Sequence, residues 1–310
     1  MFSNKKVYLT APSYELGNLK DIETLDELKE DNQILETLLK FGLKKYAKSH
    51  LPPLAMAKQT AKHTLEKVSI TRKEIDVLIY ATSSFWDSRF YDGKEVSRLS
   101  YELGLENAYP IGVFLSECGN IHTAIRTAAS LIQAGECRNI LVVTTDQTQE
   151  GETRIIPPNI SIASDAAASC IVSAEKGDFE IIHITQHTNA AMSELDINEK
   201  SEEYMYAVTE GIKQTLWKAM KFIEKEPRDF QQLITNNYSL LLSKTISDLG
   251  GFEFEQVYTE NIARFAHALA SDNLINLCDL LNNNYLNSQD LLLLLGTGSN
   301  MWGATIVSKL

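Results

Sequence analysis

Five short apolar runs, each ending in small or polar residues, stand out in the hydrophobic pattern of the chain. They cover residues 77–84, 139–146, 168–173, 233–239 and 291–299. Continuous runs of this length are typical of strands that helices bury on both faces. Between them lie amphipathic segments whose apolar spacing predicts helices at residues 54–68, 119–135, 205–225 and 273–283. Strands that alternate with helices predict an α/β protein.

Two of these strand regions resemble each other in sequence. RKEIDVLIYATSS (72–84) resembles PRDFQQLITNNYS (227–239), and Ile75 matches Phe230 about half a chain length later. Each segment is a polar turn followed by a buried strand that ends in small polar groups. This similarity predicts a duplicated α/β half. No linker rich in Pro, Gly or Ser separates the halves, so we expect them to pack as one body.

Composition narrows the class of protein. The 310 residues are 44% hydrophobic and 23% charged, which suffices for one large core or two fused ones. No uninterrupted apolar stretch reaches membrane-spanning length and the N-terminus lacks a signal-peptide core, so we expect a cytoplasmic protein with no membrane partner. The net charge of −12 disfavours a nucleic-acid partner, because phosphate binding needs clustered Lys and Arg.

The four cysteines form neither a CxxC pair nor an even framework, so no zinc site or disulfide scaffold is predicted. His183 and His187 have the spacing of metal ligands only on a helix, and their surroundings indicate a strand. We therefore expect no metal.

Cys118 lies where an apolar run meets an amphipathic helix. The positive end of a helix dipole lowers the pKa of a thiol, so this position favours a nucleophile. The alternative is a small buried residue at a strand end. His122, one helical turn further on, could point toward Cys118 or away from it.

Three motifs around Cys118 and beyond it resemble β-ketoacyl-ACP synthase III. In that family the reactive cysteine opens a helix that ends in Gly, followed by a strand of the form LVVxxD, as Cys118, Gly135 and NILVVTTD do here. ASDAAASCIV (163–172) resembles the family's GDGAGAVV strand, and GTGSNMWGA (296–304) resembles its glycine-rich turn. With FGLKK and EIDVLIYATS nearer the N-terminus, the resemblance covers nearly the whole chain.

The resemblance implies a five-layered α-β-α-β-α thiolase fold with two pseudo-symmetric halves. Residues 1–170 would carry the nucleophile, and residues 171–310 would carry a His and Asp pair and the glycine-rich turn. Cys118 and His267 would be related by the pseudosymmetry. Members dimerise through a central strand, so NILVVTTD is expected to pair a homodimer, or a heterodimer with a related subunit.

The resemblance also assigns site residues. Gly296 and Gly298 would supply a backbone N–H that forms the oxyanion hole together with the N–H of Cys118, because glycine lets a backbone approach the substrate closely. Asn236 takes the position of the family's catalytic histidine, and Asn237 follows it. Asn236, Asn237 and Ser299 are expected beside the substrate.

His267 stands where the synthases keep an asparagine, and Asp272 follows five residues later. The pair resembles the branch of the family that transfers acyl groups with a Cys-His-Asp arrangement. His267 would take the thiol proton and later activate the acceptor, while Asp272 would orient the ring. Alternatively, Asp272 caps the helix that begins near Asn273.

Three functions follow. In the first, an acyl-CoA or acyl-carrier-protein donor forms an acyl-Cys118 thioester, and a small-molecule acceptor then receives the acyl group, in fatty-acid-like or secondary metabolism. In the second, a decarboxylating or condensing synthase uses Asn236 or Asn237 with His267. In the third, the chain is a partner subunit of a heteromeric synthase, which the intact Cys118 argues against. No permanently bound cofactor is expected, since the thioester is a substrate.

Overall fold

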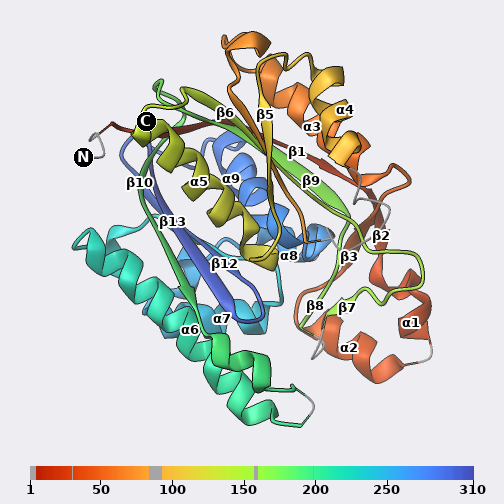
Figure 1. Ribbon diagram of the computed structural model, residues 1–310. Helices are drawn as coiled ribbons and strands as arrows, with labels where there is room; N and C mark the ends of the chain where they lie inside the picture. Colours follow the sequence, from red (N-terminus) through yellow and green to blue (C-terminus); the bar gives the residue numbers. More distant parts are fainter. Residues whose placement is uncertain (1–4, 30, 84–92, 157–159, 198) are drawn as a thin grey trace.

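The computed structural model describes residues 5–29, 31–83, 93–156, 160–197 and 199–310. Its main sheet has nine described strands in the order β11-β12-β13-β10-β1-β9-β6-β4-β5. β1 and β10 join a first and a second half of this sheet through an antiparallel pair. Helices lie between the two halves and outside each of them (Figure 1), which gives the five-layered α-β-α-β-α arrangement of the thiolase fold.

The first half alternates strands and helices along the chain. Its elements are β1 (Tyr8–Leu16), α3 (Pro53–Glu66), β4 (Val77–Ala81), α4 (Gly93–Leu103), β5 (Tyr109–Val113), α5 (Asn120–Ala134), β6 (Asn139–Asp146) and β9 (Ala166–Ser173). The second half repeats the order with β10 (Phe179–Thr188), α6 (Ser201–Phe222), β11 (Gln232–Ile234), α7 (Leu240–Gly250), α9 (Asp272–Asn282), β12 (Leu291–Thr297) and β13 (Met301–Lys309).

Smaller elements lie outside this repeat. They are β2 (Asn18–Asp21), α1 (Asp26–Lys29), α2 (Asn32–Lys40), β3 (Lys45–Lys48), β7 (Ile155–Ile156), β8 (Ser161–Ile162) and α8 (Glu260–Phe265). A separate apolar cluster joins α1, α2 and β3 to α8.

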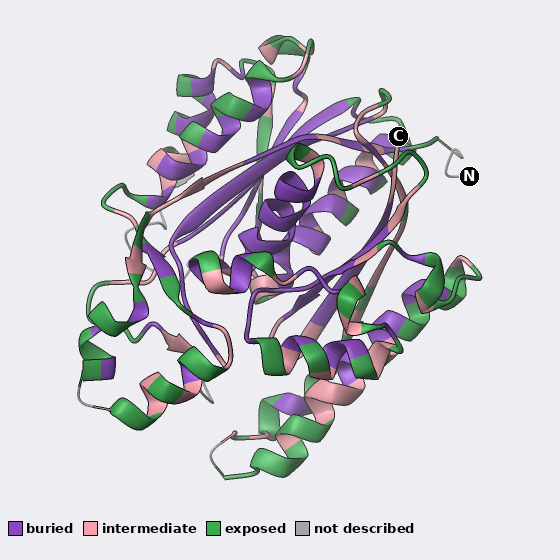
Figure 2. Cartoon of the chain, turned by 180° about the vertical axis from the view of Figure 1, so that it is seen from behind, coloured by how far each residue is buried: buried purple, intermediate pink, exposed green. Residues whose placement is uncertain are grey.

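Strand side chains alternate between an inner and an outer core. In β4, Ile79 joins the central core with α5 and α9, whereas Leu78 packs outward with α3. In β12, Leu294 faces inward and Leu293 packs outward with α6. This period of two places buried residues on both sheet faces and leaves the outer helices exposed on one side (Figure 2). The two central helices are therefore enclosed between the halves.

Strand order shows that the two halves are duplicates. In the first half β4, β6, β9 and β1 are neighbours, and in the second half β11, β12, β13 and β10 follow the same pattern. Ile75 and Phe230 each follow a 3-10 turn with a capping box, directly before β4 and β11. The halves divide between Ser173 and Phe179, the end of β9 and the start of β10, because a division at 170/171 would cut through β9.

The apolar run 233–239 forms less strand than its composition predicts. β11 ends at Ile234, because the following residues leave the sheet and turn into the interior. Ser239 then caps α7 by accepting a hydrogen bond from Leu242 N at 3.3 Å. The run 77–84 ends as strand at Ala81, and its last residue lies outside the described residues.

The strand NILVVTTD cannot pair two chains, which corrects the predicted interface. It forms β6, which is buried throughout and lies between β4 and β9. The edge of this half is β5, whose Tyr109 side chain is 48% exposed. Among the described strands, β5 pairs with β4 alone. Its other edge is therefore the one at which a strand of a second chain can pair.

Candidate active site

The loops before the two central helices bring three predicted site residues together. Cys118 lies in a 3-10 turn, η4 (Glu117–Gly119), directly before α5. His267 follows α8, and Asp272 is the first residue of α9, after a second turn, η8 (Leu269–Ser271). Because α5 and α9 form the middle layer, these loops meet between the two halves (Figure 1).

The two turns are equivalent in the duplicated halves. Glu117 and Leu269 open them with left-handed backbone, at φ of 46° and 51°. Cys118 is the second residue of the first turn, and its counterpart in the second turn is Ala270. His267 precedes the second turn. The prediction that Cys118 and His267 occupy equivalent positions is therefore wrong, although they come from equivalent loops.

The first residue of each central helix holds its loop in the same way. Asn120 Oδ1 accepts a hydrogen bond from Ser116 N at 2.9 Å, and Asp272 Oδ1 accepts one from Ala268 N at 2.7 Å. The second half has a carboxylate where the first has an amide. Asp272 does not cap α9 as the alternative expected, because this bond goes to the loop before the helix and the N-cap position is Ser271, without a side-chain cap bond. The other oxygen of Asp272 is left for the site.

Cys118, His267 and Asp272 form a continuous chain of contacts. Cys118 Sγ lies 3.2 Å from His267 Nε2, and His267 Nδ1 is hydrogen-bonded to Asp272 Oδ2. His267 and Asp272 are 1% and 0% exposed. With the Nδ1 proton donated to the carboxylate, the Nε2 lone pair points to the thiol, as a base for that sulfur requires.

Asn237 supports Asp272 and does not face a substrate, which corrects its predicted place. Its backbone N–H and its Nδ2 donate to the two oxygens of Asp272 at 2.8 and 3.0 Å. Its Oδ1 accepts from Asn276 Nδ2 at 2.9 Å. The Asp272 carboxylate is therefore held by the segment that follows β11 as well as by the loop before its own helix.

Asn236 is hydrogen-bonded to the glycine-rich turn. Asn236 is 1% exposed, accepts a hydrogen bond from Thr297 N at 2.9 Å, and donates to Leu269 O at 3.2 Å. The Gly298 N–H donates to Met301 O at 2.7 Å. Asn236 is therefore structural, and the Gly298 N–H predicted for the oxyanion hole is already used.

Gly296 is required for packing. A Cβ at this position would lie 2.6 Å from the His122 ring and 3.1 Å from Gly119 Cα. The turn must therefore pass close to the loop that carries Cys118. Of the predicted oxyanion donors, the N–H groups of Cys118 and Gly296 remain predictions.

Ser299 binds the residue that precedes the nucleophile. Its backbone N–H and its hydroxyl donate to the Glu117 carboxylate, at 2.7 Å and at 2.8 to 2.9 Å. Both residues are exposed. Ser299 thus lies at the rim of the site, with its polar groups directed to Glu117.

Comparison with known proteins agrees with this architecture. The model of the 3-oxoacyl-[acyl-carrier-protein] synthase III family matches residues 115–190, which include Cys118. A β-ketoacyl-[acyl-carrier-protein] synthase III of Phocaeicola vulgatus is 30% identical over 127 residues, or 41% of this chain and 37% of that protein. The match therefore spans well under half of that relative.

Solved structures extend the likeness to the whole chain. The 3-oxoacyl-[acyl-carrier-protein] synthase III of Aquifex aeolicus VF5 has a TM-score of 0.83 at 17% identity, covering 97% of this chain and 99% of that one. ChlB3, an acyltransferase, has a TM-score of 0.86 at 17% identity, covering 98% of each chain. The chain has the thiolase fold.

Burial raises the pKa of the Cys118 thiol well above its ordinary value, and the carboxylates of Glu117, Asp146 and Asp272 raise it further. A hydrogen bond from Tyr238 opposes them. The expected lowering by a helix dipole is not the net result, since α5 begins two residues later and the sulfur is desolvated. Cys118 therefore relies on a base for its thiolate.

His122 is a structural histidine. Its Nδ1 lies 2.8 Å from Thr305 Oγ1, and its Nε2 lies 2.8 Å from Asn273 Oδ1. Burial lowers its pKa from 6.5 to about 4. Both ring nitrogens are occupied, so His122 points away from the chemistry and ties α5 to α9 and β13.

Tyr238 is the site residue that the sequence analysis missed. Its ring centroid lies 4.6 Å from that of His267, and its phenol oxygen lies 2.8 Å from Thr297 Oγ1. It stands two residues after Asn236, in the region where the family keeps its histidine motif. That position was a signal, but the direction of the side chain depends on the turn after β11.

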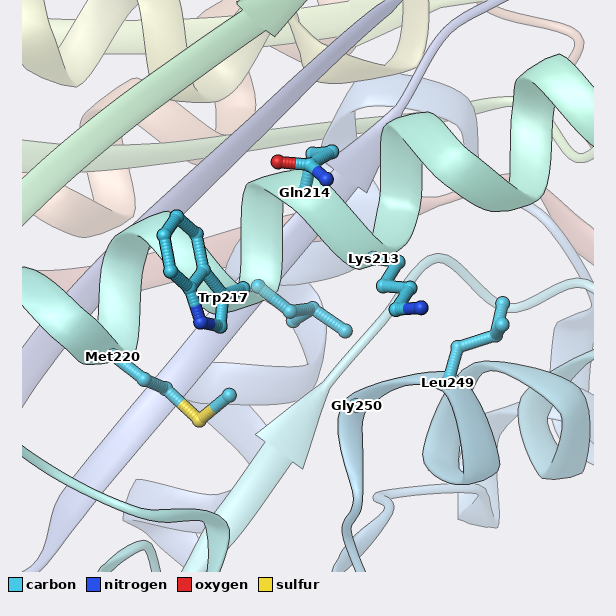
Figure 3. Close-up of a pocket in the computed structure, with 7 residues that line it drawn as sticks. Lys213, Gln214, Trp217, Met220, Leu249 and Gly250 are labelled. Carbon is cyan, nitrogen blue, oxygen red and sulfur yellow. The ribbon is translucent and has the colours of Figure 1, made fainter.

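Cys118, His267 and Asp272 do not line either of two grooves on the molecule. A groove of about 280 Å³ beside the start of α5 is lined in part by Ser116, Gly119 and Thr123. Another, of about 300 Å³, lies between α6 and α7, where Trp217 and Leu249 face it from opposite helices (Figure 3). The second is on the outer layer and is distant in the fold from the loops that carry Cys118.

Membrane-spanning helices and clusters of metal ligands are both absent from the described residues. No helix there combines the length and apolarity needed to cross a bilayer. No group of three or more His, Cys, Asp or Glu side chains there is arranged to hold a metal ion.

Proposed function

We propose that this protein is an acyltransferase that carries its acyl group on Cys118. The observation that supports this most is the Cys118 Sγ to His267 Nε2 contact of 3.2 Å, backed by the His267 to Asp272 hydrogen bond. A nucleophile, a base and an orienting carboxylate in this order are the parts of a covalent acyl-transfer site.

In the first half-reaction, His267 Nε2 takes the Cys118 proton as the sulfur attacks the carbonyl carbon of a thioester donor. The tetrahedral intermediate collapses, the carbon–sulfur bond of the donor breaks, and the departing thiolate takes the proton back from the His267 imidazolium. Asp272 stabilises the imidazolium in between. The products are acyl-Cys118 and the free donor thiol, of coenzyme A or of an acyl-carrier protein.

In the second half-reaction, His267 takes a proton from the acceptor nucleophile as that atom attacks the acyl-Cys118 carbonyl. The thioester bond breaks, and the Cys118 thiolate is protonated by the imidazolium. One base therefore serves both steps, and no bound cofactor takes part in either.

Decarboxylation of a malonyl group fits this site less well. Asn236 and Asn237, which would stabilise an enolate, are buried and bonded to Thr297 and Asp272. The exposed Glu117 carboxylate beside the nucleophile would also repel a malonyl carboxylate. Both observations favour acyl transfer over condensation.

The test is the activity of a His267→Ala variant with an acyl-thioester donor and a panel of hydroxyl and amine acceptors. Turnover should fall on the order of a hundredfold or more, because the base in contact with the thiol is removed. Asp272→Asn should cost less, because the carboxylate acts through the ring. His183→Ala, a change on the surface near Phe222, is the matched control and should retain activity.

Full activity of the His267→Ala protein would remove the proposal. Decarboxylation of a malonyl thioester as the main reaction of the unchanged protein would replace it with the condensing function.

A further inference from the structure

We infer that the phenol O–H of Tyr238 is the side-chain donor that holds the oxyanion when Cys118 attacks a thioester. The inference rests on the proposed function, since an oxyanion forms only if a carbonyl is attacked. It assigns a catalytic role to a residue whose ring packs against the proposed base, His267.

Attack on a thioester places a negative charge on the carbonyl oxygen, and enzymes meet it with preorganised donors. The glycine-rich turn is the expected source, but three successive N–H groups there are committed. Thr297 N donates to Asn236, Gly298 N to Met301 and Ser299 N to Glu117. The site therefore needs a donor from another element.

Tyr238 is placed to supply that donor. It is 7% exposed, and its ring centroid lies 4.6 Å from that of His267, whose Nε2 lies 3.2 Å from the Cys118 sulfur. Its O–H donates to Thr297 O at 3.1 Å, and its oxygen lies 2.8 Å from Thr297 Oγ1. In the proposed step the phenol O–H rotates from Thr297 O toward the acyl group on the sulfur, while the Thr297 hydroxyl donates to the phenol oxygen. Unlike a backbone N–H, a phenol O–H can rotate in this way.

The phenol stays protonated in this environment. Burial raises the pKa of Tyr238 well above 10, and the nearby Cys118 and Asp272 raise it further. Tyr238 therefore donates a hydrogen bond to the oxyanion and does not transfer its proton. The electron pair returns from the oxygen when the intermediate collapses, and the leaving thiolate takes its proton from His267.

A Tyr238→Phe variant tests this role, because it keeps the ring and removes the O–H. Two rates are compared: acylation of Cys118 by a thioester, followed by intact mass, and alkylation of Cys118 by iodoacetamide. Alkylation forms no oxyanion. We expect acylation to slow by about 100- to 1000-fold, the cost of one oxyanion donor. Alkylation should slow far less, because the lowering of the thiol pKa by Tyr238 is the smallest of the causes that act on it.

Tyr258→Phe is the matched control, since Tyr258 is a second buried tyrosine of the same half whose charged neighbours are Asp279, Glu260 and Arg264. Both of its rates should match the unchanged protein. Equal loss of acylation and alkylation in Tyr238→Phe would overturn the inference, because the phenol would then act on the thiol alone. Unchanged acylation would overturn it as well.

Failure of the proposed function would look different. It would show in the unchanged protein as alkylation without acylation by any thioester, before a variant is compared, and it would remove this inference too.

Discussion

At the scale of single residues, the Cys118 thiol is surrounded by carboxylates rather than by cations. Burial is the largest cause of its raised pKa, followed by Glu117, Asp146 and Asp272. A thiol in such a place is protonated near neutral pH until His267 removes the proton. This arrangement suits a nucleophile that becomes reactive together with its base and stays inert otherwise.

Glu117→Gln should make Cys118 react several-fold faster with iodoacetamide near neutral pH. The carboxylate raises the thiol pKa, so a neutral amide moves the rate-versus-pH curve toward lower pH. Gln can still accept the hydrogen bonds from Ser299, which keeps the rim in place. Glu255→Gln, an exposed change on another loop, should leave the curve unmoved. A Glu117→Gln curve that coincides with that of the unchanged protein contradicts this electrostatic account.

The identity of Cys118, His267 and Asp272 could be predicted because the motifs around them resemble a known family. The partners of Asp272 could not. Asn237 and Tyr238 reach the site only because β11 stops at Ile234 and the chain turns inward. A run of apolar and small polar residues contains no information about that turn.

At the scale of elements, α5 and α9 are joined through His122, which is fully buried. A neutral His122 can accept a hydrogen bond from Thr305 and donate one to Asn273. Protonation would break this arrangement and charge a desolvated group. The contact between the two central helices is therefore sensitive to acid.

The free energy of unfolding should fall as pH drops from 6.5 toward 4. In this range His122 is protonated in the unfolded state, whereas burial keeps it neutral in the folded state until about pH 4. This shift corresponds to about 3 kcal/mol. Denaturant unfolding at a series of pH values measures it. A His122→Asn variant, which cannot titrate, should show a shallower dependence between those limits, whatever its stability at neutral pH. Equal slopes in the two proteins would mean that His122 does not carry the effect.

Strands with continuous apolar runs could be predicted, and strands without them could not. β6 and β12 each contain a continuous apolar run and are entirely or almost entirely buried, and their ranges follow the pattern closely. β1 contains Pro12 and several polar residues, so it has no such run, yet it joins the two halves. Its place comes from pairing with β9 and β10, which are distant in sequence.

At the scale of the whole molecule, β5 is the edge strand of the first half of the sheet. We expect it to pair across an interface with a second copy or a related subunit. Light scattering should give twice 34.7 kDa for a homodimer. The amide protons of β5 should exchange slowly at high protein concentration and faster on dilution. A monomer at all concentrations with fast exchange in β5 contradicts the homodimer.

The central claim is that Cys118 carries the acyl group, and intact-protein mass after incubation with acyl-CoA and acyl-carrier thioesters tests it most directly. The account predicts an added mass of one acyl group, mapped to the Cys118 peptide, absent in Cys118→Ala and retained in Cys137→Ala. An adduct that persists in Cys118→Ala, or that maps to one of the three buried cysteines, would contradict it.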